Sequence, residues 1–143
     1  MGITSKIVDA LSGKPAKVTS RGQLVTAPLE FSSTTSIKLE VVDTAYTLSS
    51  PKTNKQGVIT DIIISGDKNI GTNGSILEIY EATDSTTTTV SKAILTASIA
   101  KSGNMVLTNL NWPFSEGVWL SAKCDDDNIY ITYGGYYIDS EED

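Results

Sequence analysis

The sequence contains no histidine and a single cysteine, Cys124, in 143 residues. Without histidine, the chain cannot form a Ser–His–Asp triad, a Cys–His pair or a histidine-based metal site. One cysteine excludes an intrachain disulfide, and a thiol with no histidine to activate it is expected to be a small core or edge residue. Carboxylates are plentiful, but no spacing selects a facing pair of the kind that glycosidases use. We therefore expect a protein that is not an enzyme, with no catalytic residues, no cofactor and no metal ligands.

Long apolar runs are also missing. No run approaches the length of a membrane span, and the N-terminus lacks the pattern of a signal peptide, so we expect no contact with a membrane. The length suits one ordinary domain, and 39% hydrophobic residues can form one core. Serine and threonine are abundant, and Ile, Val and Tyr recur in the apolar runs, a mixture that favours strands over helices.

Positive charge is scarce and unevenly placed. The formal net charge is −6, yet the first 28 residues carry Lys6, Lys14, Lys17 and Arg21 against one acid, Asp9. This basic segment precedes a strongly acidic body, which suggests that it docks on an acidic surface such as that of a sister subunit. Accidental clustering of a few charges is the alternative. The body lacks a basic stripe, so we expect no binding to nucleic acid.

The segment from Lys14 to Pro28 resembles an extended arm. Pro15 and Pro28 bias the residues before them toward extended backbone, and Gly22 weakens any helix or strand that would run through the segment. An extended segment needs partners for its backbone groups. It could be an edge strand of its own body, a strand added to a neighbouring subunit, or disordered. A short helix is expected before it, within residues 3–12.

From Leu29 onward the apolar residues alternate with polar ones, as in half-buried strands. Counting from Ile37 gives about eight short strands separated by turn residues, and the most β-prone run is residues 57–65. The sequence therefore predicts an all-β fold, a jelly-roll-like antiparallel β-sandwich, with another Greek-key sandwich as the alternative. We expect two parts: an N-terminal arm over residues 1–28, and a sandwich domain over residues 29–143 that ends in an acidic tail.

Two groups of residues raise the possibility of ligand binding. Aromatic residues gather in the last third of the chain and could stack on sugars or form core and interface: Trp112, Trp119, Tyr130, Tyr133, Tyr136 and Tyr137. Adjacent Tyr136 and Tyr137 must face opposite sides of a strand, which favours core and interface. The turns 125–128 and 67–71 resemble fragments of calcium loops, but neither is complete, and turn chemistry by Asp and Asn side chains explains both.

Two stretches carry a family resemblance. The run Pro15-Ala16-Lys17-Val18-Thr19-Ser20-Arg21-Gly22-Gln23-Leu24-Val25-Thr26-Ala27-Pro28 resembles the N-terminal segment of a family of virion structural proteins from tailed bacteriophages. The ending Tyr133-Gly134-Gly135-Tyr136-Tyr137-Ile138 is similar as well. The likeness extends from about Lys14 to Ile138, although the strands between these stretches are generic. It implies a place in the virion and no catalytic residues.

Within that family, a small sandwich with an extended arm suits a capsid decoration (cement) protein on the capsid surface. Such a protein would sit as a trimer where major capsid subunits meet, with its arm added as a strand to a neighbour. The residues expected to contact the partner are those of the arm: Lys14, Lys17, Val18, Arg21, Leu24 and Val25. The alternatives are another virion component, such as a head fibre, collar or tail protein, and a carbohydrate-binding module for host recognition.

Overall fold

The computed structural model describes residues 29–32 and 36–140, and these form an all-β body. Its ten strands are β1 (Leu29–Ser32), β2 (Ile37–Leu39), β3 (Tyr46–Ser49), β4 (Lys55–Gly66), β5 (Ser75–Ala82), β6 (Lys92–Ile99), β7 (Asn104–Leu107), β8 (Trp112–Phe114), β9 (Trp119–Cys124) and β10 (Ile129–Asp139). None of these residues forms a helix long and apolar enough to cross a membrane. The arm expected over residues 1–28, with its short helix, lies outside the described residues, as does the end of the acidic tail.

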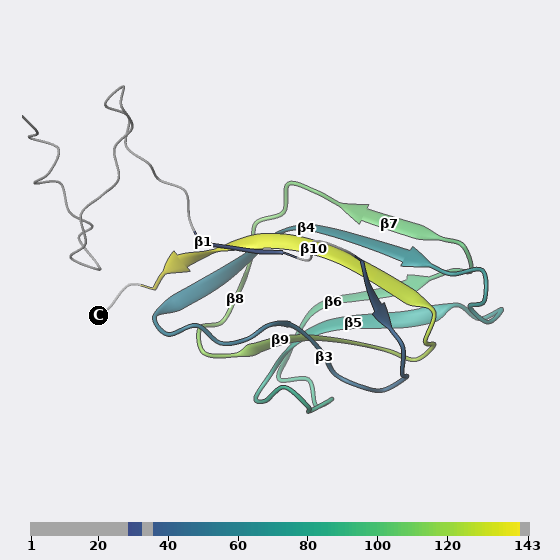
Figure 1. Cartoon of the computed structure of the whole chain (residues 1–143), viewed down its shortest axis with the longest axis horizontal. Coiled ribbons are helices and arrows are strands. Elements are labelled where there is room, and N and C mark those ends of the chain that lie inside the picture. The colour runs from purple at the N-terminus through teal and green to yellow at the C-terminus, as the bar shows by residue number, and fades with distance from the viewer. Residues whose placement is uncertain (1–28, 33–35, 141–143) are drawn as a thin grey trace, which may run out of the picture.

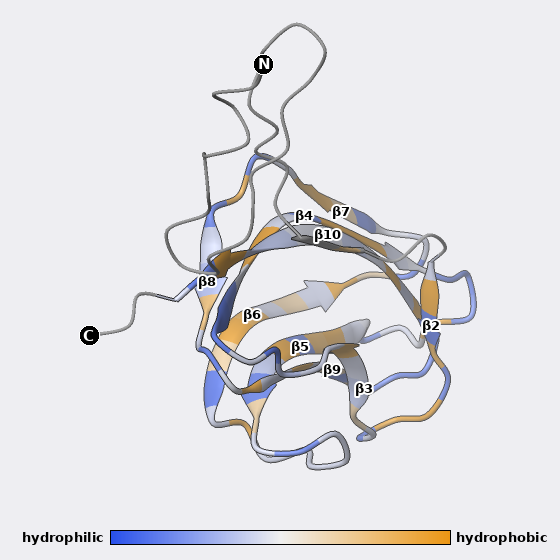
Figure 2. Ribbon diagram, turned by 60° about the vertical axis from the view of Figure 1, so that its left-hand side comes forward, coloured by the Kyte–Doolittle hydropathy of each residue, from blue (hydrophilic) through white to orange (hydrophobic). Residues whose placement is uncertain are grey.

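The strands form two antiparallel sheets that stack face to face (Figures 1 and 2). The first, here called the β4–β10 sheet, has the order β1-β10-β4-β7, with β2 also on β10 and β8 also on β4. The second, the β5–β9 sheet, has the order β3-β9-β5-β6. Each outer position of the first sheet is shared by two short strands, so the ten strands fill eight positions. The chain crosses between the sheets at almost every connection, and this interleaving confirms the predicted jelly roll.

The core fills the space between the two sheets. In β4, Ile62 and Ile64 point inward and are fully buried, while Ile63 between them points outward, as the two-residue period requires. Leu77 and Ile79 from β5 meet them from the opposite sheet. Figure 2 shows the hydrophobic colour gathered on strands of both layers. The predicted central strand over residues 57–65 is therefore confirmed, and it runs slightly longer, from Lys55 to Gly66.

Two glycines let aromatic rings lie against the β4–β10 sheet at one end of the core. A Cβ at Gly57 would lie 1.9 Å from Cζ of Phe114, and one at Gly135 would lie 2.5 Å from Cζ of Phe31. The two rings meet edge to face, with centroids 5.8 Å apart. Beside this point the register of β4 and β10 shifts between Gly134 and Gly135, and the extra residue lies on β4. The two adjacent glycines in the sequence predict a bulge or kink at this point.

The structure corrects two details of the predicted strands. The alternation of Ile37, Leu39 and Val41 with their neighbours predicts a strand that includes Val41. The strand ends at Leu39 instead, because the backbone N–H groups of Glu40 and Val41 both donate to the Tyr46 hydroxyl at 2.9 Å. Proline has no backbone N–H to donate to a neighbouring strand, so the sequence predicts that Pro113 ends a strand. It lies instead inside β8, which pairs with β4 on one side only, and proline is tolerated in such an edge strand.

Candidate interaction surfaces

The residues expected to contact a partner all belong to the arm and lie outside the described residues: Lys14, Lys17, Val18, Arg21, Leu24 and Val25. Their role therefore stays a prediction. Within the described part of the chain, the surfaces that can be compared are the outer faces of the two sheets, the edges of the sheets, and two surface hollows.

The tyrosines of β10 divide between the two faces of their strand. Tyr133 and Tyr137 point inward and reach the opposite sheet, where the Tyr133 hydroxyl donates to the Leu48 carbonyl at 2.8 Å and Tyr137 is hydrogen-bonded to the buried Ser49 hydroxyl. Burial raises the pKa of Tyr133, and nearby Tyr137 adds to the shift. These two side chains tie the sheets together, which confirms the core interpretation for both.

Tyr130 and Tyr136 point to the outer face of the β4–β10 sheet. They are six residues apart on one strand, a separation of about 20 Å, so the two rings cannot stack on one sugar. Tyr130 lies beside Lys38 of β2, whose Nζ is 5.8 Å from the ring centroid. Trp112 and Trp119 are half-buried on other strands. The aromatic residues therefore do not form a single platform.

The outer face of the β5–β9 sheet is partly covered by the connection between β5 and β6. The Tyr80 side chain lies outside the core cluster but is completely buried, and its hydroxyl donates to the Thr87 carbonyl of this connection at 2.8 Å. Lys123 on β9 donates to the Thr88 carbonyl at 2.8 Å and lies 5.3 Å from the Tyr80 ring. The threonine-rich tract of residues 83–89 predicts an exposed hairpin loop. It does join two hairpin strands, but it also folds back onto its own sheet.

Electrostatics agree with this folded-back loop. Burial raises the pKa of Tyr80, and the negative charges of Glu78 and Asp84 raise it further. The Asp84 carboxylate accepts the backbone N–H groups of Thr86 and Thr87, both at 2.8 Å, and the Thr86 hydroxyl at 2.9 Å. These bonds, that of the Thr86 N–H first, lower the pKa of Asp84. The loop is thus held by its own Asp and Thr side chains as well as by the sheet.

The outer face of the β4–β10 sheet is more open and more apolar. Ile63 on β4 and Val106 on β7 stand directly opposite each other in the register and are 41% and 60% exposed. Tyr136 and the 42% exposed Ile138 lie on the same face along β10. Sequence reasoning missed this surface, because the run Ile62-Ile63-Ile64 does not show which of its members points outward. The alternation along β7 was the available signal: Met105 and Leu107 pack against the core, so Val106 between them must face outward.

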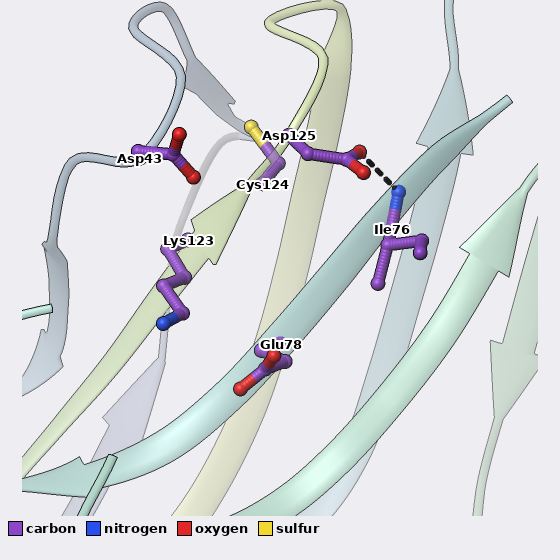
Figure 3. Close-up of a pocket in the computed structure, with 6 residues that line it drawn as sticks. All are labelled: Asp43, Ile76, Glu78, Lys123, Cys124 and Asp125. Atoms are coloured by element: carbon purple, nitrogen blue, oxygen red, sulfur yellow. Dashed lines mark hydrogen bonds between the residues drawn. The ribbon is translucent and has the colours of Figure 1, made fainter. Parts of the chain in front are cut away.

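A hollow of about 220 Å³ lies where β5 and β9 approach residue 43 (Figure 3). Asp43, Glu78, Lys123, Asp125, Ile76 and Cys124 line it. Asp125 accepts the Ile76 N–H at 2.6 Å, and Lys123 is bound to the loop, so neither side chain is free for a ligand. Burial, together with the adjacent acids, raises the pKa of Cys124 to about 11, which keeps its thiol protonated near neutral pH. Cys124 belongs to the core cluster, as predicted.

The two acidic turns singled out in the sequence meet at one end of the sandwich. Asp126 accepts the Gly71 N–H at 3.1 Å, and this hydrogen bond lowers the pKa of Asp126. Asp67 accepts the Asn69 N–H at 2.9 Å within its own turn. The carboxylates are used as turn acceptors, as the turn interpretation predicted. In the described ranges no three His, Cys, Asp or Glu side chains are grouped so that they could hold a metal ion.

Comparisons of the chain with protein-family models, with curated proteins and with solved structures find no match.

Proposed function

We propose that this chain is a non-enzymatic virion structural protein, a capsid decoration (cement) protein that binds the major capsid lattice as a trimer. The observation that carries the proposal is the difference between the two outer faces of the jelly roll. The β5–β9 face is partly covered by the chain's own loop and exposes Ile76, whereas the β4–β10 face presents the apolar pair Ile63 and Val106, with Ile138, to solvent. Apolar side chains grouped on one open face are a feature of protein–protein contact sites.

The remaining support comes from the sequence. The resemblance of residues 15–28 and 133–138 to virion proteins suggests a place in the particle, and the basic N-terminal segment precedes an acidic body. In the proposed arrangement, the β4–β10 face rests on the capsid surface or on a sister subunit. The arm, through Val18, Arg21, Leu24 and Val25, would reach the next subunit. The protein would then stabilise the lattice by burying surface, without chemistry.

The test is co-sedimentation of the purified full-length protein with capsids that lack it. Val106→Asp should weaken binding at least tenfold, since burying an exposed valine side chain is worth about 1.5–3 kcal/mol and an aspartate in its place must be desolvated. Ile76→Asp is the matched control, because Ile76 is 48% exposed on the outer face of the other sheet. Equal binding by the two variants would refute the role of the β4–β10 face.

Cryo-electron microscopy of the intact particle separates cement from other virion roles. A cement protein is expected as trimers repeated over the whole lattice, whereas a fibre, collar or tail protein occupies a few special positions. Full-length Arg21→Glu and Lys17→Glu variants test the arm, and both should reduce capsid binding while leaving the thermal unfolding of the body unchanged. Absence of the chain from purified particles, judged by mass spectrometry, would refute a virion role altogether.

A further inference from the structure

The four edges of the sandwich are not equally protected. Natural sheets guard their edges with short strands, proline, bulges or charge. Three of the edges are formed by short strands. β3 has four residues and an irregular register with β9. β1 and β2, which share one edge, have four and three residues, and β7 and β8, which share another, also have four and three, with Pro113 in β8. β6 is different: it has eight residues, no proline and a single charge, Lys92. Its bulge, which adds Ile94, lies near its beginning and leaves the rest regular.

Within the described part of the chain, β6 pairs only with β5, so its other edge has no strand partner there. On the other layer, the positions of β7 and β8 form the corresponding edge of the β4–β10 sheet. The chain passes directly from β6 to β7 through the turn at Ser102, so these two edges lie on the same side of the sandwich (Figures 1 and 2). We call the space between them the β6 seam.

The core is incompletely covered along the β6 seam. Half-buried apolar side chains pack against the core from β6, from β7 and β8, and from the segment between β7 and β8: Ile94, Leu95, Met105, Leu107, Leu110 and Trp112. A hollow of about 320 Å³ opens here, lined by Lys92, Ala93 and Ile94 of β6 and by Trp112 and Pro113 of β8. A long strand edge beside an apolar hollow is the arrangement by which sheets bind extended peptides: the backbone gives affinity, and the hollow selects a side chain.

The charge along the seam indicates what kind of chain it would accept. Residues 85–115 contain Lys92 and Lys101 and no Asp or Glu, although the whole chain has a net charge of −6. The adjacent strand β5 carries two acids, but Glu78 lies on the outer face of its sheet and buried Glu81 accepts hydrogen bonds from Ser115. A second copy of this chain would bring another acid-free, positive edge to the seam, whereas a segment with acidic side chains would be attracted.

We propose that the outer edge of β6 is a strand-addition site for an extended segment of a partner protein that carries alternating apolar and acidic side chains. The segment pairs antiparallel or parallel with β6 over residues 95–99, where the strand is regular. One large apolar side chain enters the hollow against Trp112 and Ile94, and an acidic side chain lies near Lys92. This site uses neither Ile63 and Val106 nor any residue of the segment 1–28, so the inference does not depend on whether the protein belongs to a virion.

The test uses a displayed library of random octapeptides selected against the full-length protein. The selected peptides are expected to share alternating apolar residues with at least one Asp or Glu. A synthetic consensus peptide should slow hydrogen exchange of alternate β6 amides at least tenfold, and the same peptide N-methylated at alternate residues should not. Lys92→Glu should weaken binding of the consensus peptide at least fivefold. Lys38→Glu, the same charge change at the β2 edge, should leave the binding unchanged.

Three outcomes would overturn the proposal. One is a library that yields no enriched peptide, or only peptides that protect another part of the protein. Another is a consensus peptide without acidic residues, or one whose binding is unaffected by Lys92→Glu. The third is protection of β6 by the protein itself at rising concentration, with the mass of a dimer, because a second copy would then be the natural occupant of the edge.

Discussion

The buried carboxylate of Glu81 provides a sharp test of how the two layers of the sandwich are joined. Glu81 lies on β5 and is only 4% exposed. One of its oxygens accepts the backbone N–H of Ser115 at 2.7 Å, and the other accepts the Ser115 hydroxyl at 3.0 Å. Ser115 follows β8 directly, so this pair holds the connection that leads from the β4–β10 sheet back to the β5–β9 sheet.

The expected cost of Glu81→Ala follows from these two bonds. Hydrogen bonds to a charged group contribute about 1.5–3 kcal/mol each, and the substitution also leaves the Ser115 N–H without its acceptor. We expect Glu81→Ala to lower the free energy of unfolding by about 3 kcal/mol, which corresponds to a fall in Tm of roughly 12 °C. Ser115→Ala removes only the hydroxyl bond and should cost about 1.5 kcal/mol, the lower end of that range.

The assay is urea unfolding of the single variants and of the double variant Glu81→Ala/Ser115→Ala. Because the Ser115 hydroxyl has already lost its partner in the Glu81→Ala background, the second substitution should add little, giving a coupling energy of about 1.5 kcal/mol. Glu78→Ala, three residues earlier on β5 and half-exposed on the outer face, is the control and should change the free energy of unfolding by less than about 0.5 kcal/mol. If Glu81→Ala is as stable as the control, or if the costs of the two single substitutions simply add in the double variant, the hydrogen bonds between Glu81 and Ser115 do not hold the two sheets together.

Three further predictions concern other parts of the core. The Cys124 thiol has its ordinary pKa of 9.0 in the unfolded chain and a pKa of about 11 in the folded one, so the free energy of unfolding should fall as the pH rises from 9 to 11. Cys124→Ala should make that fall shallower in urea unfolding. Tyr137→Phe removes the hydrogen bond to Ser49 and should cost about 1 kcal/mol by thermal unfolding; an unchanged Tm would contradict a tie between the sheets. Gly57→Ala places a methyl group inside the Phe114 ring and should cost about 1–3 kcal/mol in calorimetry, and it would be harmless only if that ring were free to move.

The sequence was sufficient to predict the class of fold because its signals are local. Alternation along the chain and turn residues between the runs mark most of the strands, and eight positions in two sheets follow from their number and spacing. The sequence did not predict in the same way that two short strands share each outer position of the β4–β10 sheet. Pro113 looks like the end of a strand in the sequence, and only its place on an edge beside β4 lets it remain inside one.

The surfaces proposed for binding depend on information that the sequence does not contain locally. Ile63 lies in a run of three isoleucines, and which of them faces solvent depends on the layer that covers the others. The exposed edge of β6 depends on the strand order, which is a property of the whole fold. The threonine tract gave no sign that it would reach back to Tyr80 and Lys123, since that contact requires the hairpin to be formed first.

The position of β10 has a consequence for synthesis. It is the last of the ten strands in the chain, yet it lies in the interior of its sheet, between β4 on one side and β1 and β2 on the other. Until β10 has left the ribosome, β4 has no neighbour on that side and the first two strands have none at all in their sheet. The body should therefore become compact only after β10 has been made, and its closure depends on contacts between segments far apart in the sequence, which makes it slow.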